Sequence, residues 1–244
     1  MQKKVIEQNP CCSDLVEESQ LPFYSVADIC SSNQLSMLSL FSGCGGMDLG
    51  FEGNFICHRK SVPNGSDWIQ RKLNSDWVLL KKNRFKTVFA NDILREAMLS
   101  WNNYMSRFDV DSNIYHFQSI VDLVKLHKSG VKVFPDSVDI VTGGFPCQDF
   151  SVAGKRRGFD SSMMHDGSRR TEDEPTEESR GKLYYWMKQV IDIVKPKIFI
   201  AENVKGLVNL GDVKTIIQKD FSNADGGVYC TDSQGVRCWK LWRA

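Results

Sequence analysis

The feature that most constrains the fold of this chain is an apolar segment followed at once by a glycine-rich turn. Residues 35–41 are apolar and suited to a β-strand, residues 42–46 contain three glycines, and residues 47–51 can continue as a helix. A glycine turn at this point lets the backbone approach a ligand closely and directs helix N–H groups toward it. The order therefore predicts a strand, a turn and a helix that bind a ligand.

Strand and helix patterns continue to alternate along the chain. Apolar segments typical of strands occupy residues 87–90, 137–142 and 197–201, and helical periodicity runs through residues 93–104 and 183–194. Such alternation predicts an α/β fold, with a doubly wound, Rossmann-like parallel sheet whose ligands gather at the carboxyl ends of the strands.

Three segments fall outside this alternation. Residues 1–34 have weak periodicity and are predicted to be an N-terminal extension, which leaves one domain in residues 35–244. Residues 64–84 are rich in Lys, Asn, Ser and Trp and are expected to insert a loop or hairpin. Residues 160–179 are polar and include a strongly acidic run, so we expect a mobile loop there.

Charge and cysteine content bound the function classes. A net charge of +1 does not indicate a partner, because a dedicated nucleic-acid-binding domain usually has a strong basic excess. Contacts with a polyanion must therefore come from local clusters or from a surface that this chain lacks. The eight cysteines include no CxxC pair, which favours reduced thiols in the cytoplasm over disulfides or a metal site. No segment has the character of a signal peptide or a membrane span, so no membrane partner is expected.

The first candidate site is a cofactor grip. The turn that follows the first strand would present its backbone to the ligand, and Asp92, at the end of the next predicted strand, could accept hydrogen bonds from a ribose diol. Such a turn alone is more often ordinary loop structure. The glycines do not follow the G-x-G-x-x-G spacing, so a dinucleotide-dependent dehydrogenase is poorly supported. The residues of this grip are Phe41, Ser42, Gly43, Cys44, Gly45, Gly46 and Asp92.

The second candidate site is a nucleophile. Cys147 follows a buried type of strand directly after Pro146, which favours an extended backbone at Phe145 and projects the thiol outward. A catalytic thiol needs nearby positive charge, because a free one is only a few per cent ionised at neutral pH. Lys155, Arg156 and Arg157 could supply that charge, whereas Cys30, Cys44 and Cys57 are expected to be buried, small apolar residues.

The partner of this thiol would be Glu202, at the end of the predicted strand 197–201. Since the ends of parallel strands meet at one edge, its carboxyl group can face the same cleft. An isolated acidic residue at a strand end is more often a cap or a solvated side chain, but two reactive groups beside a cofactor turn indicate an active site.

Taken in order, four motifs strongly resemble those of the DNA cytosine-5 methyltransferase family. The motifs are residues 41–46, Asn91-Asp92, residues 144–148 (Gly-Phe-Pro-Cys-Gln) and residues 202–204 (Glu-Asn-Val). The resemblance implies a fold of the S-adenosylmethionine-dependent methyltransferase class, in which the turn, Asp92, Ser119 and Phe145 hold S-adenosylmethionine. It also implies that Cys147 attacks carbon 6 of cytosine in double-stranded DNA while Glu202 engages nitrogen 3. The implied DNA-facing residues are Pro146, Gln148, Ser151, Lys155, Arg156, Arg157 and Asn203, of which Asn203 also helps to hold the Pro-Cys loop.

Two departures from the family pattern matter. Ser119 stands where the family usually carries an Asp that accepts a hydrogen bond from the adenine amino group. A serine hydroxyl can also accept this hydrogen bond, but it lacks the negative charge that strengthens the bond to Asp. The chain also stops at Ala244, where the family normally continues into a target-recognition domain, so we expect a sheet that is incomplete at its C-terminal end. Four functions are consistent with the sequence. The chain could be a restriction-modification type enzyme or a catalytic subunit completed by a second polypeptide. It could also be an inert remnant or regulatory partner, or an RNA cytosine methyltransferase.

Overall fold

The computed structural model describes residues 34–108, 111–146, 163–169, 179–204, 212–232 and 238–243, all within one compact unit, Gln34–Arg243. The predicted N-terminal extension lies outside the described residues except for Gln34, and so does the acidic run 171–178.

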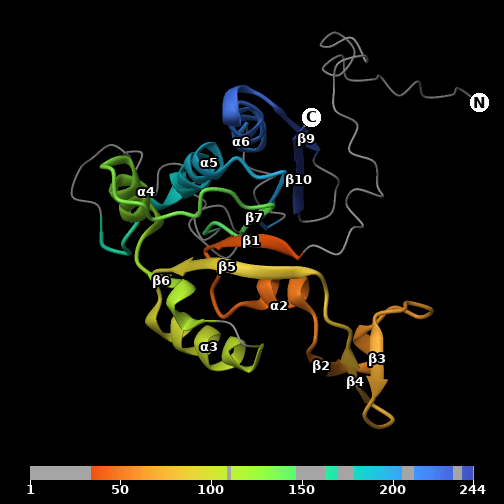
Figure 1. Ribbon diagram of the computed structural model, residues 1–244. Coiled ribbons are helices and arrows are strands. Elements are labelled where there is room, and N and C mark those ends of the chain that lie inside the picture. Colours follow the sequence, from red (N-terminus) through yellow and green to blue (C-terminus); the bar gives the residue numbers. More distant parts are fainter. Residues whose placement is uncertain are drawn as a thin grey trace, which may run out of the picture. The chain divides into compact units, whose positions relative to one another are not determined.

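A seven-stranded sheet forms the centre of the described unit (Figure 1). Its strand order is β6-β5-β1-β7-β8-β10-β9; the first five of these are mutually parallel, and β10 runs antiparallel to both β8 and β9. The doubly wound α/β fold is therefore confirmed, and the C-terminal segment adds two strands that the sequence had not indicated. The strands are β1 (Leu35–Leu40), β5 (Phe85–Asp92), β6 (Tyr115–Phe117), β7 (Ile140–Gly143), β8 (Ile198–Glu202), β9 (Tyr229–Asp232) and β10 (Cys238–Arg243).

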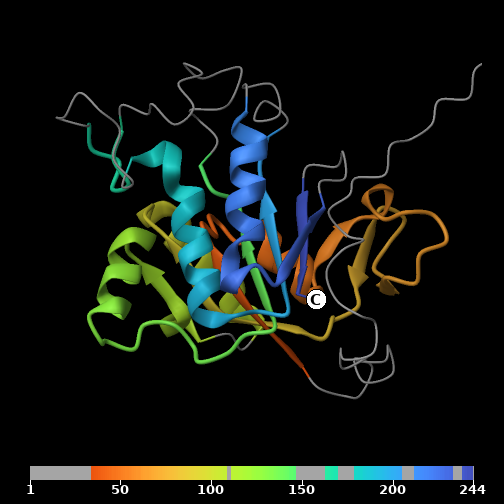
Figure 2. The same cartoon turned by 90° about the horizontal axis from the view of Figure 1, so that it is seen from above.

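Helices cover both faces of this sheet. In the two overall views α2 and α3 lie on one face, and α4, α5 and α6 lie on the other (Figures 1 and 2). Their bounds are α2 (Gly46–Glu52), α3 (Arg95–Met105), α4 (Ile120–Lys128), α5 (Leu183–Val194) and α6 (Val213–Ser222). Short 3-10 helices are η2 (Arg59–Ser61), η3 (Ser106–Phe108), η4 (Ser112–Ile114), η5 (Arg180–Lys182) and η7 (Ala224–Gly226).

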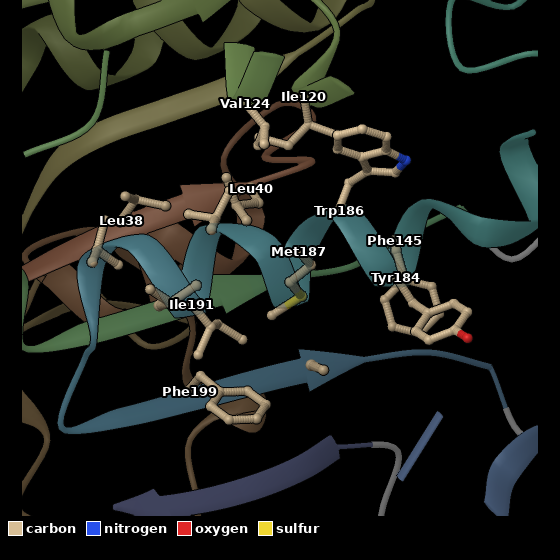
Figure 3. Packing of buried hydrophobic residues seen from close by; sticks show 14 of the residues in the cluster. Leu38, Leu40, Ile120, Val124, Phe145, Tyr184, Trp186, Met187, Ile191 and Phe199 are labelled. Carbon is tan, nitrogen blue, oxygen red and sulfur yellow. The ribbon is translucent and has the colours of Figure 1, made fainter. Parts of the chain in front are cut away.

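Helix α5 supplies much of the larger apolar core. Its buried side chains recur at helical spacing, and Met187 and Ile191 lie against β1 and β8, where Leu38 and Phe199 are fully buried (Figure 3). The helix ends at Lys195, whose φ of 46° is left-handed, immediately before a proline that cannot continue it. Burying a side chain of this size stabilises the fold by roughly 1.5–3 kcal/mol, so this one helix fixes the centre of the sheet.

An inserted segment between α2 and β5 forms a second, antiparallel sheet. Its strands are β2 (Ile56–His58), β3 (Ile69–Lys72) and β4 (Trp77–Leu80), in the order β2-β4-β3. The expected hairpin is β3–β4, and β2 adds a third strand. Backbone bonds from Asn83 to Glu52 (2.8 Å) and from Leu35 to Arg84 (2.7 Å) join the insertion to the amino edge of the central sheet.

Candidate active site

A pocket of about 410 Å³ opens at the carboxyl edge of the central sheet. It lies where the strand order reverses around β1, which is the usual ligand position in doubly wound sheets. Six residues predicted from the sequence line it, namely Phe41, Asp92, Ser119, Phe145, Pro146 and Glu202. The structure thus brings Phe41 and Asp92 of the first candidate site and Glu202 of the second to one cavity. His165 also lines it, as does Asn91, which belongs to a motif but had no predicted role.

The glycine turn is held in place by the end of β5. Asp92 accepts a hydrogen bond from the Gly43 backbone N–H with its Oδ2 atom (3.0 Å) and one from Leu94 N–H with its Oδ1 atom (3.0 Å). Ser42 N–H donates to the Asn91 carbonyl (2.8 Å). Gly43, with a φ of 54°, has open space where a Cβ would stand, and so does Gly46. The turn therefore presents bare backbone beside the pocket.

Gly45 is required by packing as well as by conformation. Its φ is 88°, and a Cβ there would lie 2.7 Å from Cδ1 of Trp101, a side chain of α3 that is fully buried. The Trp101 indole N–H donates to Asp48 (2.6 Å), so the ring is not free to withdraw. Only a residue without a side chain fits between the turn and α3.

We expect Gly45→Ala to destabilise the protein by about 2–4 kcal/mol, because strain at positive φ adds to an overpacked contact. Urea unfolding followed by circular dichroism measures this loss. Gly50→Ala is the matched control, since Gly50 lies within α2, the helix that Gly45 caps, with open space around the added carbon. The control should be neutral or slightly stabilising; equal loss in both variants would contradict the packing argument.

A buried carboxyl group that was not predicted from the sequence lies beneath the turn. Asp48 is fully buried and accepts hydrogen bonds from Ser39 Oγ (2.5 Å) and Trp101 Nε1 (2.6 Å). Burial raises its pKa to about 6, and these two hydrogen bonds keep the pKa from rising further. The group links β1, α2 and α3 below the cofactor turn. No residue type or spacing in the sequence distinguishes it from a solvated helical Asp.

Asp48 makes stability depend on pH. Its pKa is about 6 in the folded protein against 3.8 ordinarily, so the folded state binds the proton more tightly. The contribution of this group is unfavourable by about 3 kcal/mol above pH 6 and vanishes as pH falls toward 4. We expect Asp48→Asn, which keeps an acceptor for Trp101, to lack this gain on acidification. Urea unfolding of both proteins at several pH values measures the difference, and parallel pH profiles would contradict the assignment.

Ser119 lies at the N-cap of α4 and is buried at the pocket wall. Its Oγ accepts from Val121 N–H (3.3 Å) and makes a 2.8 Å hydrogen bond with Nδ1 of His165. Beside it, the Asn91 amide donates to the Gln118 carbonyl (2.6 Å), while its buried Oδ1 atom has no partner among the described residues. This wall of the pocket therefore offers neutral hydrogen-bonding groups.

Glu202 and Asn203 lie at the end of β8, next to the segment that precedes Cys147. The Asn203 amide donates to the Phe145 carbonyl (3.0 Å). Asn203 is 5% exposed and Phe145 is 3% exposed. The Glu202 Oε2 atom lies 3.4 Å from the position that a Cβ on Gly144 would take. The carboxyl group is thus beside the segment 144–146 at the mouth of the pocket.

Several predicted site residues lie outside the described residues. They are Cys147, Gln148, Ser151, Lys155, Arg156 and Arg157. Cys30 also lies outside them. The prediction that Cys44 is buried is wrong: its thiol is exposed, because the turn directs this side chain away from the core, and Cys57 is half-buried.

Comparison with known proteins identifies the family. A family model described as C-5 cytosine-specific DNA methylase matches residues 35–231. The chain belongs to this family. The resemblance found in the motifs is therefore confirmed over most of the chain. The matched range includes the inserted sheet and the strands β5 and β8, which end at Asp92 and Glu202 beside the pocket.

Relatives of this chain are type II and related methyltransferases. M.NgoFVII of Neisseria gonorrhoeae is 32% identical over 195 residues, which cover 79% of this chain and 37% of the relative. M.BsuRI of Bacillus subtilis is 32% identical, with coverage of 79% and 37%. The DNA (cytosine-5-)-methyltransferase M.ApeKI of Aeropyrum pernix is 30% identical, with coverage of 78% and 33%. The chain thus spans 33–37% of the length of these relatives.

No described helix combines the length and apolar character needed to cross a bilayer. Within the same residues, no group of three or more His, Cys, Asp or Glu side chains is arranged to hold a metal ion.

Proposed function

We propose that this methylase chain is the catalytic portion of an enzyme that transfers a methyl group from S-adenosylmethionine to carbon 5 of cytosine in double-stranded DNA. One observation carries the proposal. A single pocket is lined by Phe41, which directly precedes the glycine turn, by Asp92, which binds that turn, and by Glu202 and Pro146, the residue before Cys147.

The residues of the pocket suit an adenosyl cofactor. The bare backbone at Gly43 and Gly46 leaves space that a side chain would fill, and the Asp92 carboxylate could accept hydrogen bonds from a ribose diol. The unpartnered Oδ1 of Asn91 and the hydroxyl of Ser119 are acceptors suited to an amino group. Phe41 and Phe145 add apolar walls. S-adenosylmethionine, when bound, supplies an electrophilic methyl group on a sulfonium.

The reaction follows from the chemistry of cytosine. Carbon 5 is a poor nucleophile until the Cys147 thiolate adds to carbon 6 while Glu202 donates a proton or hydrogen bond to nitrogen 3. Carbon 5 then takes the methyl group, loses its proton to a base, and the thiolate is eliminated. Asn203 acts as a positioning residue, because its bond to the Phe145 carbonyl fixes the backbone two residues before the thiol.

The DNA contacts are assigned to the residues on either side of the thiol. A base inside a duplex is out of reach of this pocket, so cytosine must leave the stack at a cost of a few kcal/mol. Pro146 and Gln148 would meet the flipped nucleotide, together with Ser151. Three successive basic residues, Lys155, Arg156 and Arg157, would neutralise phosphates and favour ionisation of the thiol.

Transfer of tritiated methyl groups from S-adenosylmethionine tests this function. The chain should label cytosine carbon 5 in duplex DNA, alone or when co-expressed with a second polypeptide that supplies target recognition, as in a restriction-modification system. Transfer RNA serves as the competing acceptor. If only the transfer RNA is labelled, the substrate is RNA and not DNA. Cofactor binding without transfer under every condition would favour an inert or regulatory role and overturn the proposal.

A further inference from the structure

The inserted segment has a charge unlike that of the rest of the chain. Residues 55–84 contain seven Lys and Arg against two Asp, whereas the whole chain carries a net charge of +1. Four of its basic side chains, Lys60, Arg71, Lys72 and Lys82, are exposed and make no ion pair with a described residue. A local positive surface of this kind attracts a polyanion even in a protein that is nearly neutral overall.

Strand register defines which side chains share a face of the inserted sheet. Trp77 on β4 pairs with His58, and Leu79 pairs with both Ile56 and Arg71. Leu73 N–H bonds to the Trp77 carbonyl, and Lys81 N–H bonds to the Trp68 carbonyl, which extends the pairing beyond both ends of β4. Because successive side chains alternate between faces, these residues lie on one side, called the open face here. The open face consists of Ile56, His58, Trp68, Arg71, Leu73, Trp77, Leu79 and Lys81.

The apolar side chains of the two faces differ in burial. On the other face, Val78 is 1% exposed, although Lys72, which pairs with it, is exposed. On the open face, Ile56 is 56% exposed, Trp68 54% and Trp77 46%. Large aromatic side chains on a small sheet are rarely left in water without a partner to bind.

The residues of the open face suit a nucleic acid strand with unstacked bases. No Asp or Glu is among them, and Asp67 at its margin is already paired with Lys81 (3.2 Å). His58 packs edge-on against the Trp77 ring (5.7 Å between centroids), which steadies the indole. Lys81, the neighbour of Trp68, is four positions after Trp77, so the backbones that carry the two indoles are about 14 Å apart along the strand direction, and the rings can stack on separate bases.

We propose that the open face binds single-stranded DNA, with bases stacked on Trp68 and Trp77 and a phosphate neutralised by Arg71, while the exposed lysines elsewhere on the insertion add to the positive field. Exposed antiparallel strands that combine aromatic and basic side chains bind single strands in this way. The surface is separate from the active site, because the insertion joins the central sheet at its amino edge (Figure 1). The pocket opens at the carboxyl edge. Binding of a single strand at this surface would be a function additional to the proposed methyl transfer.

Binding of a fluorescently labelled oligothymidylate to the full chain tests the proposal. This probe contains no cytosine, so it has no substrate for the active site. Fluorescence anisotropy should report binding that weakens with salt, and tryptophan emission should be quenched. Trp77→Ala should weaken binding about tenfold and Trp68→Ala by a similar factor, since one stacked base is lost in each case. Trp77→Tyr should restore most of the affinity, which a merely structural loss would not allow.

Phe117→Ala is the matched control, because Phe117 is a 50% exposed aromatic side chain on the central sheet, away from the open face. This variant should bind like the wild type, and Arg71→Glu should bind more weakly than Trp77→Ala at low salt. Absence of binding, or equal binding by all variants, would overturn the proposal. Tighter binding of duplex thymidylate–adenylate would also overturn it, as would a dimer of the chain that the tryptophan substitutions dissociate.

Discussion

We expect the Cys147→Ser variant to form no covalent complex with duplex DNA that contains 5-fluorocytosine. After the thiolate adds to carbon 6 and the methyl group is transferred, fluorine cannot leave carbon 5 as a proton does, so the wild-type protein remains bound to the base. A serine hydroxyl is far less ionised at neutral pH and does not add. The loss should be complete on a denaturing gel, and the affinity for S-adenosylmethionine, measured calorimetrically, should change by less than about twofold.

Cys44→Ser is the matched control for this experiment. Its thiol is exposed in the glycine turn, so it is the described cysteine best placed to compete as a nucleophile. The control should trap DNA as the wild type does. An adduct that persists in Cys147→Ser, or disappears in Cys44→Ser, would reassign the nucleophile.

The Glu202→Gln variant should methylate cytosine about 10²–10⁴-fold more slowly, with little change in cofactor affinity. Glutamine can still lie beside Gly144, but its amide gives no proton to nitrogen 3, so the addition of the thiolate to carbon 6 loses its driving force. Single-turnover transfer of labelled methyl groups measures the chemical step directly.

Glu96→Gln, which changes an exposed carboxyl group in the first turn of α3, is the control for Glu202→Gln. It should retain the wild-type rate. A Glu202→Gln rate within about threefold of the wild type would remove Glu202 from the chemistry, and equal losses in both variants would point to charge rather than proton donation.

The central sheet was predictable because each of its parallel strands carries a local signal. Residues 35–41 are an apolar segment followed by the glycine turn, and residues 197–201 are an apolar segment followed by Glu202. Apolar residues recur at helical spacing in residues 183–194. Strands β9 and β10 lacked such a signal, since their position depends on pairing with β8 rather than on a local pattern. The third strand of the insertion was missed for the same reason, because β2 has only three residues.

The candidate site was predictable where residues belong to motifs and not where they act through packing. The glycine turn, Asp92 and Glu202 stand at strand ends, and the sheet brings them together. The bonds between Asp48 and Trp101, or between Ser119 and His165, join residues 46 to 53 positions apart. Which of these distant residues come into contact depends on the folded backbone and has no local signal in the sequence. The exposure of Cys44 was likewise set by the turn conformation rather than by residue type.

The most direct test of the account is the mass of the peptide that carries the trapped nucleotide. Trypsin should release residues 133–155, which contain Cys147 as their only cysteine. The account predicts that this peptide carries one 5-fluorocytosine nucleotide together with one additional methyl group. An adduct on the peptide that contains Cys44, or an adduct on residues 133–155 without the methyl group, would contradict it.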